Sequence, residues 1–213
     1  MHLRESDIER LDEIPDGEPD AIVVLGPGTG FGEAFLTRTK AGWHVVAGEG
    51  SHGRFAPQSE RHVELWRYLT KRWPEHVSVE RIVSGPGIEN VYDFITDGLP
   101  VDPRIGHENR AAHITELALA GTCSHCVETI EIFVDVFADE AATMVLKCNA
   151  DQVYLGGGIP PRILPFIRER FRKTFESKGR YREMQEKVSI RVVLYDDPGL
   201  LGAGIGALEL LNS

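Results

Sequence analysis

Apolar and polar positions form strand-like patterns most clearly in the first third of the chain. Three short runs rich in β-branched and aromatic residues, at 21–25, 33–38 and 43–47, predict β-strands. A cluster of glycines separates the first two runs, and Ala41-Gly42 forms a turn between the last two. Closely spaced glycines allow positive φ angles and close backbone contact, so we expect a strand, a glycine turn and a strand.

The middle of the chain has the spacing of helices instead. Ser59 is a suitable N-cap for a helix that runs to about Arg72, and Pro74 ends that segment. Shorter helices are expected at about 88–96 and 111–120. The longest expected helix, 124–148, is apolar around most of its circumference, which predicts burial between two layers.

The last third of the chain alternates between the two patterns. We expect a strand at 153–155, a helix from Pro160 to about 177, a strand at 190–195 and a final helix at 199–211. The order is a β-meander, then helices, then β-α-β-α. It predicts an α/β fold in which helices pack against a mixed sheet.

The first twenty residues differ from the rest in charge. They contribute −6 of the total net charge of −10, because eight acidic residues face only Arg4 and Arg10. Leu3, Ile8 and Leu11 give a thin helical stripe. We therefore expect an exposed acidic leader at 1–20 and a domain at 21–213. The acidic residues are Glu5, Asp7, Glu9, Asp12, Glu13, Asp16, Glu18 and Asp20.

Composition and charge exclude several classes of protein. With 42% hydrophobic and 26% charged residues, the chain of 213 residues has the make-up of a globular domain. The net charge of −10 disfavours nucleic acid as the main partner, although nucleotides can bind through backbone amides. No run reaches membrane-spanning length, no signal peptide is recognisable, and three cysteines form no disulfide framework. A cytoplasmic setting is expected.

The glycine turn is the first candidate for chemistry. Gly26, Gly28, Gly30 and Gly32 surround Thr29, and such a turn bares backbone N–H groups that bind phosphate well. No lysine follows, so the turn is not a P-loop. A strand rather than a helix follows, so it fails the dinucleotide fingerprint. A tight hairpin without a ligand explains the same residues, and both interpretations stay open.

Glu49 and His52 lie in the glycine-rich loop after the third expected strand. Between glycines their side chains are unshielded, and a carboxylate and an imidazole can bond the hydroxyls of a polyol. A solvent-facing loop is the simpler explanation for these two residues alone. A zinc motif of the H-E-x-x-H type is excluded, because it needs two histidines on a helix.

A second glycine run, Gly156 to Gly158, ends a strand and precedes the helix expected at Pro160. A helix N-terminus offers free amides and a positive dipole end, which suits a nucleotide. A tight turn between strand and helix explains the run equally well. Asp196-Asp197-Pro198-Gly199 has the composition of a helix N-cap, and capping is the expected role.

Cys123 and Cys126 have the spacing of half a zinc site. A structural zinc needs four ligands, and Cys148 is the third and last cysteine of the chain. Along one helix, Cys148 would lie roughly 33 Å from Cys126. Nearby histidines keep a mixed site open, but ordinary thiols at the start of a helix are the expectation.

Six motifs in order resemble the bacterial glucokinase family from about residue 20 to the C-terminus. Together they are far more specific than any one of them. The resemblance covers Gly26-Pro-Gly-Thr-Gly30, Gly48-Glu-Gly-Ser-His52, Phe55-Ala-Pro57, Glu80-Arg-Ile-Val-Ser-Gly-Pro-Gly87, Gly156-Gly-Gly-Ile-Pro160 and Asp197-Pro-Gly-Leu-Leu-Gly202.

The resemblance implies an actin-like ATPase fold of the ribonuclease H type, with two α/β domains and the active site between them. This chain would be the large C-terminal domain. The family transfers the γ-phosphoryl group of Mg-ATP to the 6-hydroxyl of glucose, and it suggests a homodimer. By matching position, Glu49, His52 and Glu80 would bind glucose, Gly28, Thr29 and Gly30 would form the second phosphate loop, and Gly156, Gly157 and Gly158 would form the adenosine motif.

The sequence departs from the family in one respect. It contains neither a D-x-G-G-T phosphate loop nor the Asn-Asp pair whose aspartate is the general base. The small N-terminal domain is therefore expected to be missing, and no catalytic residue is assigned in this chain. Loss of a general base costs about 10²- to 10⁴-fold in rate, so the chain alone should be a poor kinase or none. The alternative is a non-catalytic sugar- or nucleotide-binding protein derived from a glucokinase.

Overall fold

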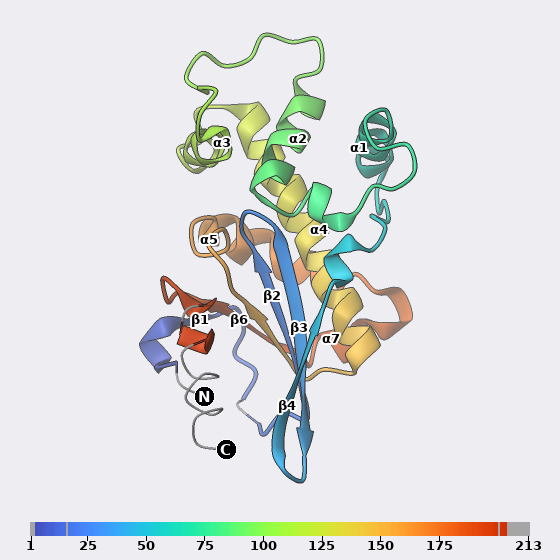
Figure 1. The fold of residues 1–213 in the computed structure, drawn as a ribbon, viewed down its shortest axis with the longest axis vertical. Helices are drawn as coiled ribbons and strands as arrows, with labels where there is room; N and C mark the ends of the chain where they lie inside the picture. Colours follow the sequence, from blue (N-terminus) through green and yellow to red (C-terminus); the bar gives the residue numbers. More distant parts are fainter. Residues whose placement is uncertain (1–2, 16, 200, 204–213) are drawn as a thin grey trace.

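The molecule consists of a mixed β-sheet and a group of helices (Figure 1). The computed structural model describes residues 3–15, 17–199 and 201–203. The strands are β1 (Ile8–Arg10), β2 (Ala21–Pro27), β3 (Phe31–Thr39), β4 (Gly42–Gly48), β5 (Gln152–Leu155) and β6 (Ser189–Val193). The α-helices are α1 (Glu60–Thr70), α2 (Gly85–Ile95), α3 (Arg110–Leu119), α4 (Ser124–Cys148), α5 (Leu164–Phe166), α6 (Arg172–Phe175) and α7 (Arg182–Gln185). Short 3-10 helices lie at Glu5–Asp7, Gly50–His52, Val79–Arg81 and Gly179–Tyr181, and a π-helical turn at Ile167–Phe171.

The strands of the described residues form a sheet of order β1-β6-β5-β2-β3-β4. Strands β2, β3 and β4 are an antiparallel meander, and β5 and β6 extend the sheet from β2 in parallel. The α/β fold with a mixed sheet is confirmed. The expected strands of the meander are also found, each a few residues longer because the ladder continues up to the turns.

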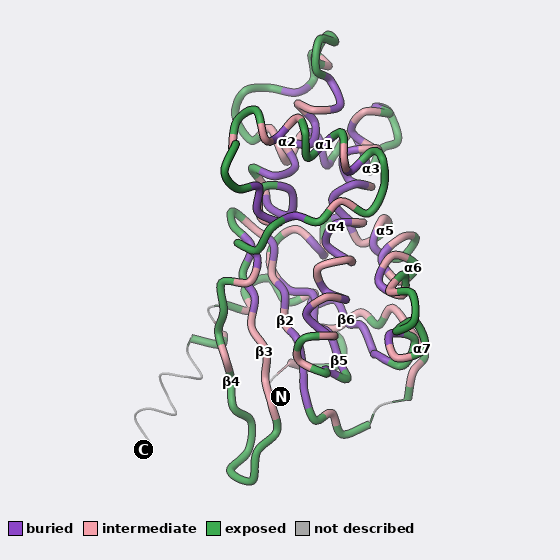
Figure 2. Tube along the Cα trace, turned by 90° about the vertical axis from the view of Figure 1, so that its right-hand side faces the viewer, coloured by how far each residue is buried: buried purple, intermediate pink, exposed green. Residues whose placement is uncertain are grey.

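The two faces of the sheet are buried to different extents. Val23 and Leu25 of β2 point into the main core, whereas Ile22 and Val24 belong to a small cluster on the other face with Tyr154. This alternation follows from the two-residue period of a strand. Strand β4 is mostly exposed, as is the tip of the β3–β4 hairpin that projects beyond the sheet (Figure 2).

Helix α4 joins the sheet to the helical group formed by α1, α2 and α3 (Figure 1). It runs without a break for 25 residues and contacts α2, α3, α6 and β2. Phe133 and Phe137 are fully buried within it. The prediction that this helix is buried between layers is confirmed, because apolar side chains on all its sides meet neighbouring elements.

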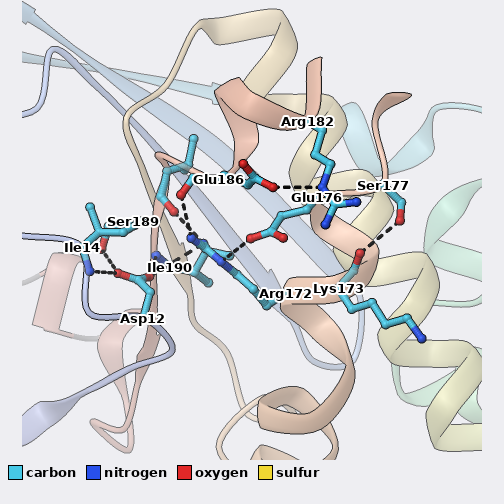
Figure 3. A network of polar contacts seen from close by, with 11 residues as sticks. Asp12, Ile14, Arg172, Lys173, Glu176, Ser177, Arg182, Glu186, Ser189 and Ile190 are labelled. Atoms are coloured by element: carbon cyan, nitrogen blue, oxygen red, sulfur yellow. Dashed lines mark hydrogen bonds and ion pairs between the residues drawn. The ribbon is translucent and has the colours of Figure 1, made fainter. Parts of the chain in front are cut away.

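The acidic leader differs from the expectation. Instead of a helical stripe, Ile8–Arg10 forms an edge strand that pairs antiparallel with β6, with Ile8 opposite Val193. The carboxylate of Asp12 accepts the Ile190 N–H over 2.6 Å and lies 3.8 Å from the Arg172 guanidinium (Figure 3). Its side chain is only 6% exposed. The helical expectation for this segment is wrong, because the strand is fixed by a partner almost two hundred residues away.

The segment after β5 also differs from the expectation of one helix from Pro160. Residues 160–163 are turns, and the regular helix begins at Leu164. Pro165 explains the shift, since proline lacks an N–H and is tolerated only in the first turn of a helix. The helix then passes through the π-helical turn Ile167–Phe171 before α6.

No single helix in the described ranges is long and apolar enough to cross a bilayer. Helices α3 and α4 reach the necessary length and hydropathy only as a pair, which is bent by 101°.

Residues 198–199 and 201–203 are helical, as expected for the start of the last helix. The rest of that expected helix, 204–211, lies outside the described residues.

Candidate active site

The turn between β2 and β3 is a tight hairpin. Pro27 pairs with Phe31 across the ladder, and the Gly28 N–H donates to the Gly30 carbonyl over 2.7 Å. The predicted strand, glycine turn and strand are confirmed. Thr29 and Gly30 are exposed, and no hydrogen bond between described residues uses their amide nitrogens. Exposed amides of this kind can donate to phosphate oxygens.

The glycine run after β5 lies against this hairpin. The Gly156 N–H donates to the Leu25 carbonyl over 2.8 Å, and Gly157 has a φ of 81°. A Cβ at position 157 would lie 2.5 Å from the Pro27 carbonyl oxygen. Both the positive φ and the close approach require glycine there. Gly158, in contrast, has open space where a Cβ would lie.

The run Gly156 to Gly158 is followed by turns rather than directly by a helix. Because the regular helix begins only at Leu164, the expected positive dipole end does not adjoin these glycines. Because glycine has no side chain, the run can contact a ligand only through its backbone. No hydrogen bond between described residues uses the amide nitrogens of Gly157 and Gly158. The two glycine segments together thus present four amides of this kind.

The three residues assigned to the sugar come together. His52 Nε2 lies 3.6 Å from Glu49 Oε2, and His52 Nδ1 lies 4.0 Å from Glu80 Oε1. The side chains are 86%, 55% and 26% exposed for Glu49, His52 and Glu80 respectively. Two carboxylates thus flank one imidazole, and all three remain accessible to solvent.

Backbone contacts with residues 76–79 hold the loop that carries Glu49 and His52. The Phe55 N–H donates to the Val77 carbonyl over 2.9 Å, and the Val79 N–H donates to the Gly53 carbonyl over 3.0 Å. His76 Nε2 is 2.6 Å from the His52 carbonyl oxygen. His76 lies in an unpatterned segment after Pro74, so no local pattern pointed to it.

Glu80 contacts both His52 and the glycine hairpin. Its Oε2 accepts the Phe31 N–H over 2.9 Å, at the first residue of β3. The Gly85 N–H donates to the Gly28 carbonyl over 2.8 Å, so the start of α2 also contacts the hairpin. The Ser84 side chain caps that helix by accepting the Gly87 N–H. One carboxylate therefore contacts both halves of the site.

The donor set fits a sugar and a nucleotide side by side. Carboxylates accept hydrogen bonds from hydroxyls, and an imidazole can donate or accept. The amides of Thr29, Gly30, Gly157 and Gly158 supply donors that phosphate oxygens need. A metal ion has no ready ligand set, since no group of three His, Cys, Asp or Glu able to hold one exists among the described residues.

The cysteines occupy the ends of α4. Cys123 is the N-cap, its sulfur accepts the Cys126 N–H over 3.4 Å, and Cys148 is the last residue of the helix. The helix between them is unbroken, so Cys148 lies far from the other two. Burial, and then the neighbouring Cys123, raise the pKa of Cys126, which makes this thiol a weak nucleophile.

Sequence reasoning missed a buried carboxyl group next to the loop 49–59, which carries Glu49 and His52 and is called the sugar loop for their expected role. Glu33 of β3 is only 5% exposed. The strand pattern contained the signal, because Phe31, Glu33 and Phe35 alternate and therefore share the inner face of the sheet.

The sheet order, with its antiparallel meander extended by two parallel strands, defines an α/β domain of the actin-like ATPase type. The chain belongs to the glucokinase family, whose model, described as glucokinase, matches residues 1–210. The expected resemblance is thus confirmed.

Curated relatives agree over most of the chain. It is 37% identical to the glucokinase of Shigella sonnei (strain Ss046) over 199 residues, which covers 92% of this chain and 60% of the relative. The glucokinase of Escherichia coli (strain K12 / DH10B) is 36% identical with the same coverage. The chain therefore spans about 60% of the length of the curated relatives it matches.

Solved structures show the same fold. The glucokinase from an Antarctic psychrotroph is 33% identical with a TM-score of 0.84, covering 99% of this chain and 64% of that one. A Balamuthia mandrillaris glucokinase in complex with glucose has a TM-score of 0.74 at 21% identity, covering 87% and 54% of the two chains. A ROK family glucokinase from Streptomyces griseus, in complex with glucose and AMPPNP, has a TM-score of 0.60 at 18% identity, covering 88% and 60%.

Proposed function

We propose that this chain is the large-domain part of a sugar kinase of the glucokinase type. Glu49, His52 and Glu80 bind the hydroxyls of glucose or a close hexose. The hairpin glycines Gly28 and Gly30, Thr29 between them, and the run Gly156 to Gly158 bind the phosphates and the adenosine of Mg-ATP. The observation that supports the proposal is the contact of Glu80 with both His52 and the hairpin, because it joins the residues proposed for the two ligands.

The reaction joins the 6-hydroxyl oxygen of the sugar to the γ-phosphorus as the bond from that phosphorus to the ADP oxygen breaks. ATP with its magnesium supplies the phosphoryl group. The chain's own residues orient the hydroxyl and donate amides to the phosphates, and such positioning carries much of phosphoryl transfer. The proton of the hydroxyl needs a general base, and no aspartate of this chain matches the family's base by motif.

The isolated chain should therefore bind sugar but turn over slowly or not at all. Its half of the site keeps the hydroxyl contacts, whereas missing general-base catalysis lowers the rate by about 10²- to 10⁴-fold. Measuring glucose-dependent ADP formation by the chain alone tests this expectation. A rate typical of a complete kinase would show that a base is present after all.

Sugar binding is tested by calorimetry with glucose. We expect Glu49→Ala and His52→Ala each to weaken binding by about tenfold or more, because hydrogen bonds to charged groups contribute about 1.5–3 kcal/mol. Glu116→Gln on the exposed side of α3 serves as the matched control and should leave affinity unchanged. Glucose binding that ignores both substitutions would contradict the assignment of these residues.

A non-catalytic sugar- or nucleotide-binding protein is the second candidate. The observation in its favour is that the side chains of Glu49, His52 and Glu80 are accessible to solvent, which sugar binding without turnover also requires. The two candidates separate when the N-terminal domain of a related glucokinase is added to the chain. Restored turnover identifies a kinase part, whereas glucose binding without turnover identifies a binding protein.

We also propose a cytoplasmic homodimer, which the family resemblance suggests. Light scattering coupled to size-exclusion chromatography tests the assembly, and a mass of one 23.7 kDa chain at all concentrations would contradict it.

A further inference from the structure

Glu33 places a carboxyl group beneath the loop that carries the proposed sugar residues. It lies on the inner face of β3 and is 5% exposed. Neither carboxyl oxygen has a hydrogen-bond partner among the described residues. An ionised carboxylate in such a place loses its hydration without compensation, so the neutral form is favoured.

The carboxyl group lies directly against the backbone of the loop. A Cβ at Gly50 would lie 2.2 Å from Glu33 Oε2, so any side chain at position 50 would displace the carboxyl from its present place. Glu33 also pairs with Gly48 across the β3–β4 ladder. Gly50 directly follows Glu49 and comes two residues before His52. A change at Glu33 therefore acts on the segment between the two proposed sugar ligands.

The charges around Glu33 come from α4. Burial raises the pKa of Glu33 to about 7, the charge of Glu140 adds to this rise, and Lys147 opposes it. Burial also raises the pKa of Glu140 and of Cys148, which lie on the same helix. The other neighbours, Leu25 on β2, Gly48 on β4 and Gly50 in the loop, carry no ionisable side chain.

Space for water adjoins the same loop. A cavity of about 140 Å³ lies between residues 50–58 and α4, and Gly50, Glu140 and Lys147 are among its lining residues. A few waters fit in a cavity of this size with polar lining. Ionised Glu33 could thus gain hydration only by moving its carboxylate toward this cavity or by displacing Gly50.

We propose that Glu33 is a positioning residue for the sugar site: its neutral carboxyl supports Gly50 and keeps Glu49 and His52 in the arrangement that binds the hexose. Loss of its proton to solvent displaces the segment 49–52 and weakens hexose binding. The inference rests on the proposed function in naming the hexose as the ligand. The expected movement of the segment 49–52 does not depend on the proposed function.

The first test measures glucose affinity of the full chain by calorimetry between about pH 6 and about pH 8. Wild-type affinity should fall by at least about fivefold as the pH rises through the range where Glu33 ionises. Glu33→Gln keeps the shape without the charge, so its affinity should stay near the acidic wild-type value throughout. Glu116→Gln, the exposed control, should follow the wild type. A wild-type profile in Glu33→Gln would overturn the proposal.

The second test does not depend on sugar. Amide hydrogen exchange of a peptide covering residues 49–53 is compared between the wild type and Glu33→Gln at matched pH. The wild type should lose protection there relative to Glu33→Gln above about pH 7 and match it at lower pH. If glucose fails to bind at any pH but this difference is present, the proposed function fails and the positioning role stands. Equal protection at every pH would overturn the positioning role.

A third variant guards against a folding defect in Glu33→Gln. Gly50→Ala forces a methyl group into the space of the Glu33 carboxyl. It should weaken glucose binding at all pH values and make the affinity independent of pH in this range. Gly50→Ala with wild-type affinity and a wild-type pH profile would contradict the contact on which the proposal is built.

Discussion

The glycine hairpin and the sugar loop meet at Glu80, but they are built from different parts of the chain. On the hairpin side, the Gly157 backbone packs so closely against Pro27 that no side chain fits. On the sugar side, the groups proposed to bind the hexose are the side chains of Glu49 and His52, which are 86% and 55% exposed. On the hairpin side, we expect added volume at Gly157 to have the larger effect. On the sugar side, we expect changes of charge at Glu49 and His52 to have the larger effect.

The largest effect should come from Gly157→Ala. The added Cβ would lie 2.5 Å from a carbonyl oxygen at a φ of 81°. We expect a loss of about 3 kcal/mol or more in the free energy of unfolding, together with loss of nucleotide binding. Urea unfolding and calorimetry with an ATP analogue measure the two effects.

Gly158→Ala is the matched control, because open space surrounds that position. It should change the free energy of unfolding by less than about 1 kcal/mol. Equal losses in both variants would show that the close approach at residue 157 does not matter.

Next in size is the effect of Glu33 on stability. Its pKa in the folded chain, about 7, lies above the ordinary 4.5, so folding takes up a proton between these values. The stability that this carboxyl contributes is complete below about pH 4.5 and is lost as the pH rises through about 7. Glu33→Gln should therefore be about 2–3 kcal/mol more stable than the wild type above about pH 8, relative to their difference at low pH.

Chemical unfolding over this pH range measures the difference. Glu116→Gln should follow the wild type at every pH, since this side chain is exposed. A constant difference between Glu33→Gln and the wild type would mean that Glu33 has an ordinary pKa.

Glu80 tests how strongly the two halves depend on each other. Glu80→Ala removes the acceptor of the Phe31 N–H and should cost about 1.5 kcal/mol of stability. Glu80→Gln retains a carbonyl acceptor for that N–H and should cost clearly less. Both variants should weaken glucose binding, because both lose the carboxylate. Retained glucose affinity in Glu80→Gln would confine this residue to support of the hairpin.

The smallest effect concerns Ser59, where the sugar loop ends and α1 begins. Ser59 caps α1 by accepting the His62 N–H. Ser59→Ala should lower the free energy of unfolding by about 1 kcal/mol and leave glucose affinity unchanged. Ser59→Asp, which can cap in the same way, should restore the stability. A fall in glucose affinity would extend the sugar loop into this helix.

Local patterns were enough to predict the meander and the caps. The β-branched run of β2, the glycine turn and Ser59 act through neighbours in the sequence, so their signals are local. Strand β1 left no such signal, since Ile8 is its one apolar residue and pairing with β6 fixes it. Pro165 did hold information on the start of α5, but Pro160 and Pro161 gave an earlier and wrong start.

The candidate site could be predicted as a set of residues but not as a geometry. Glu49, His52 and Glu80 were named from motifs, whereas their distances depend on contacts between residues 53–55 and 77–79. The position of His76 near His52 and the burial of Glu33 result from those contacts and from the packing of the sheet. Packing of this kind is not encoded in any short window of sequence.

The length of α4 gives the molecule a mechanical link. Its 25 residues span about 37 Å. The helix contacts α2 and α3. The sulfur of its Met144 would lie 3.8 Å from a Cβ at Gly50. The same helix therefore connects the helical group to the neighbourhood of the sugar loop. A small tilt of α4 at its contacts with α2 and α3 would displace its other end, next to the sugar loop. We therefore expect substitutions in the packing of α2 and α3 on α4 to alter the proposed hexose binding as well.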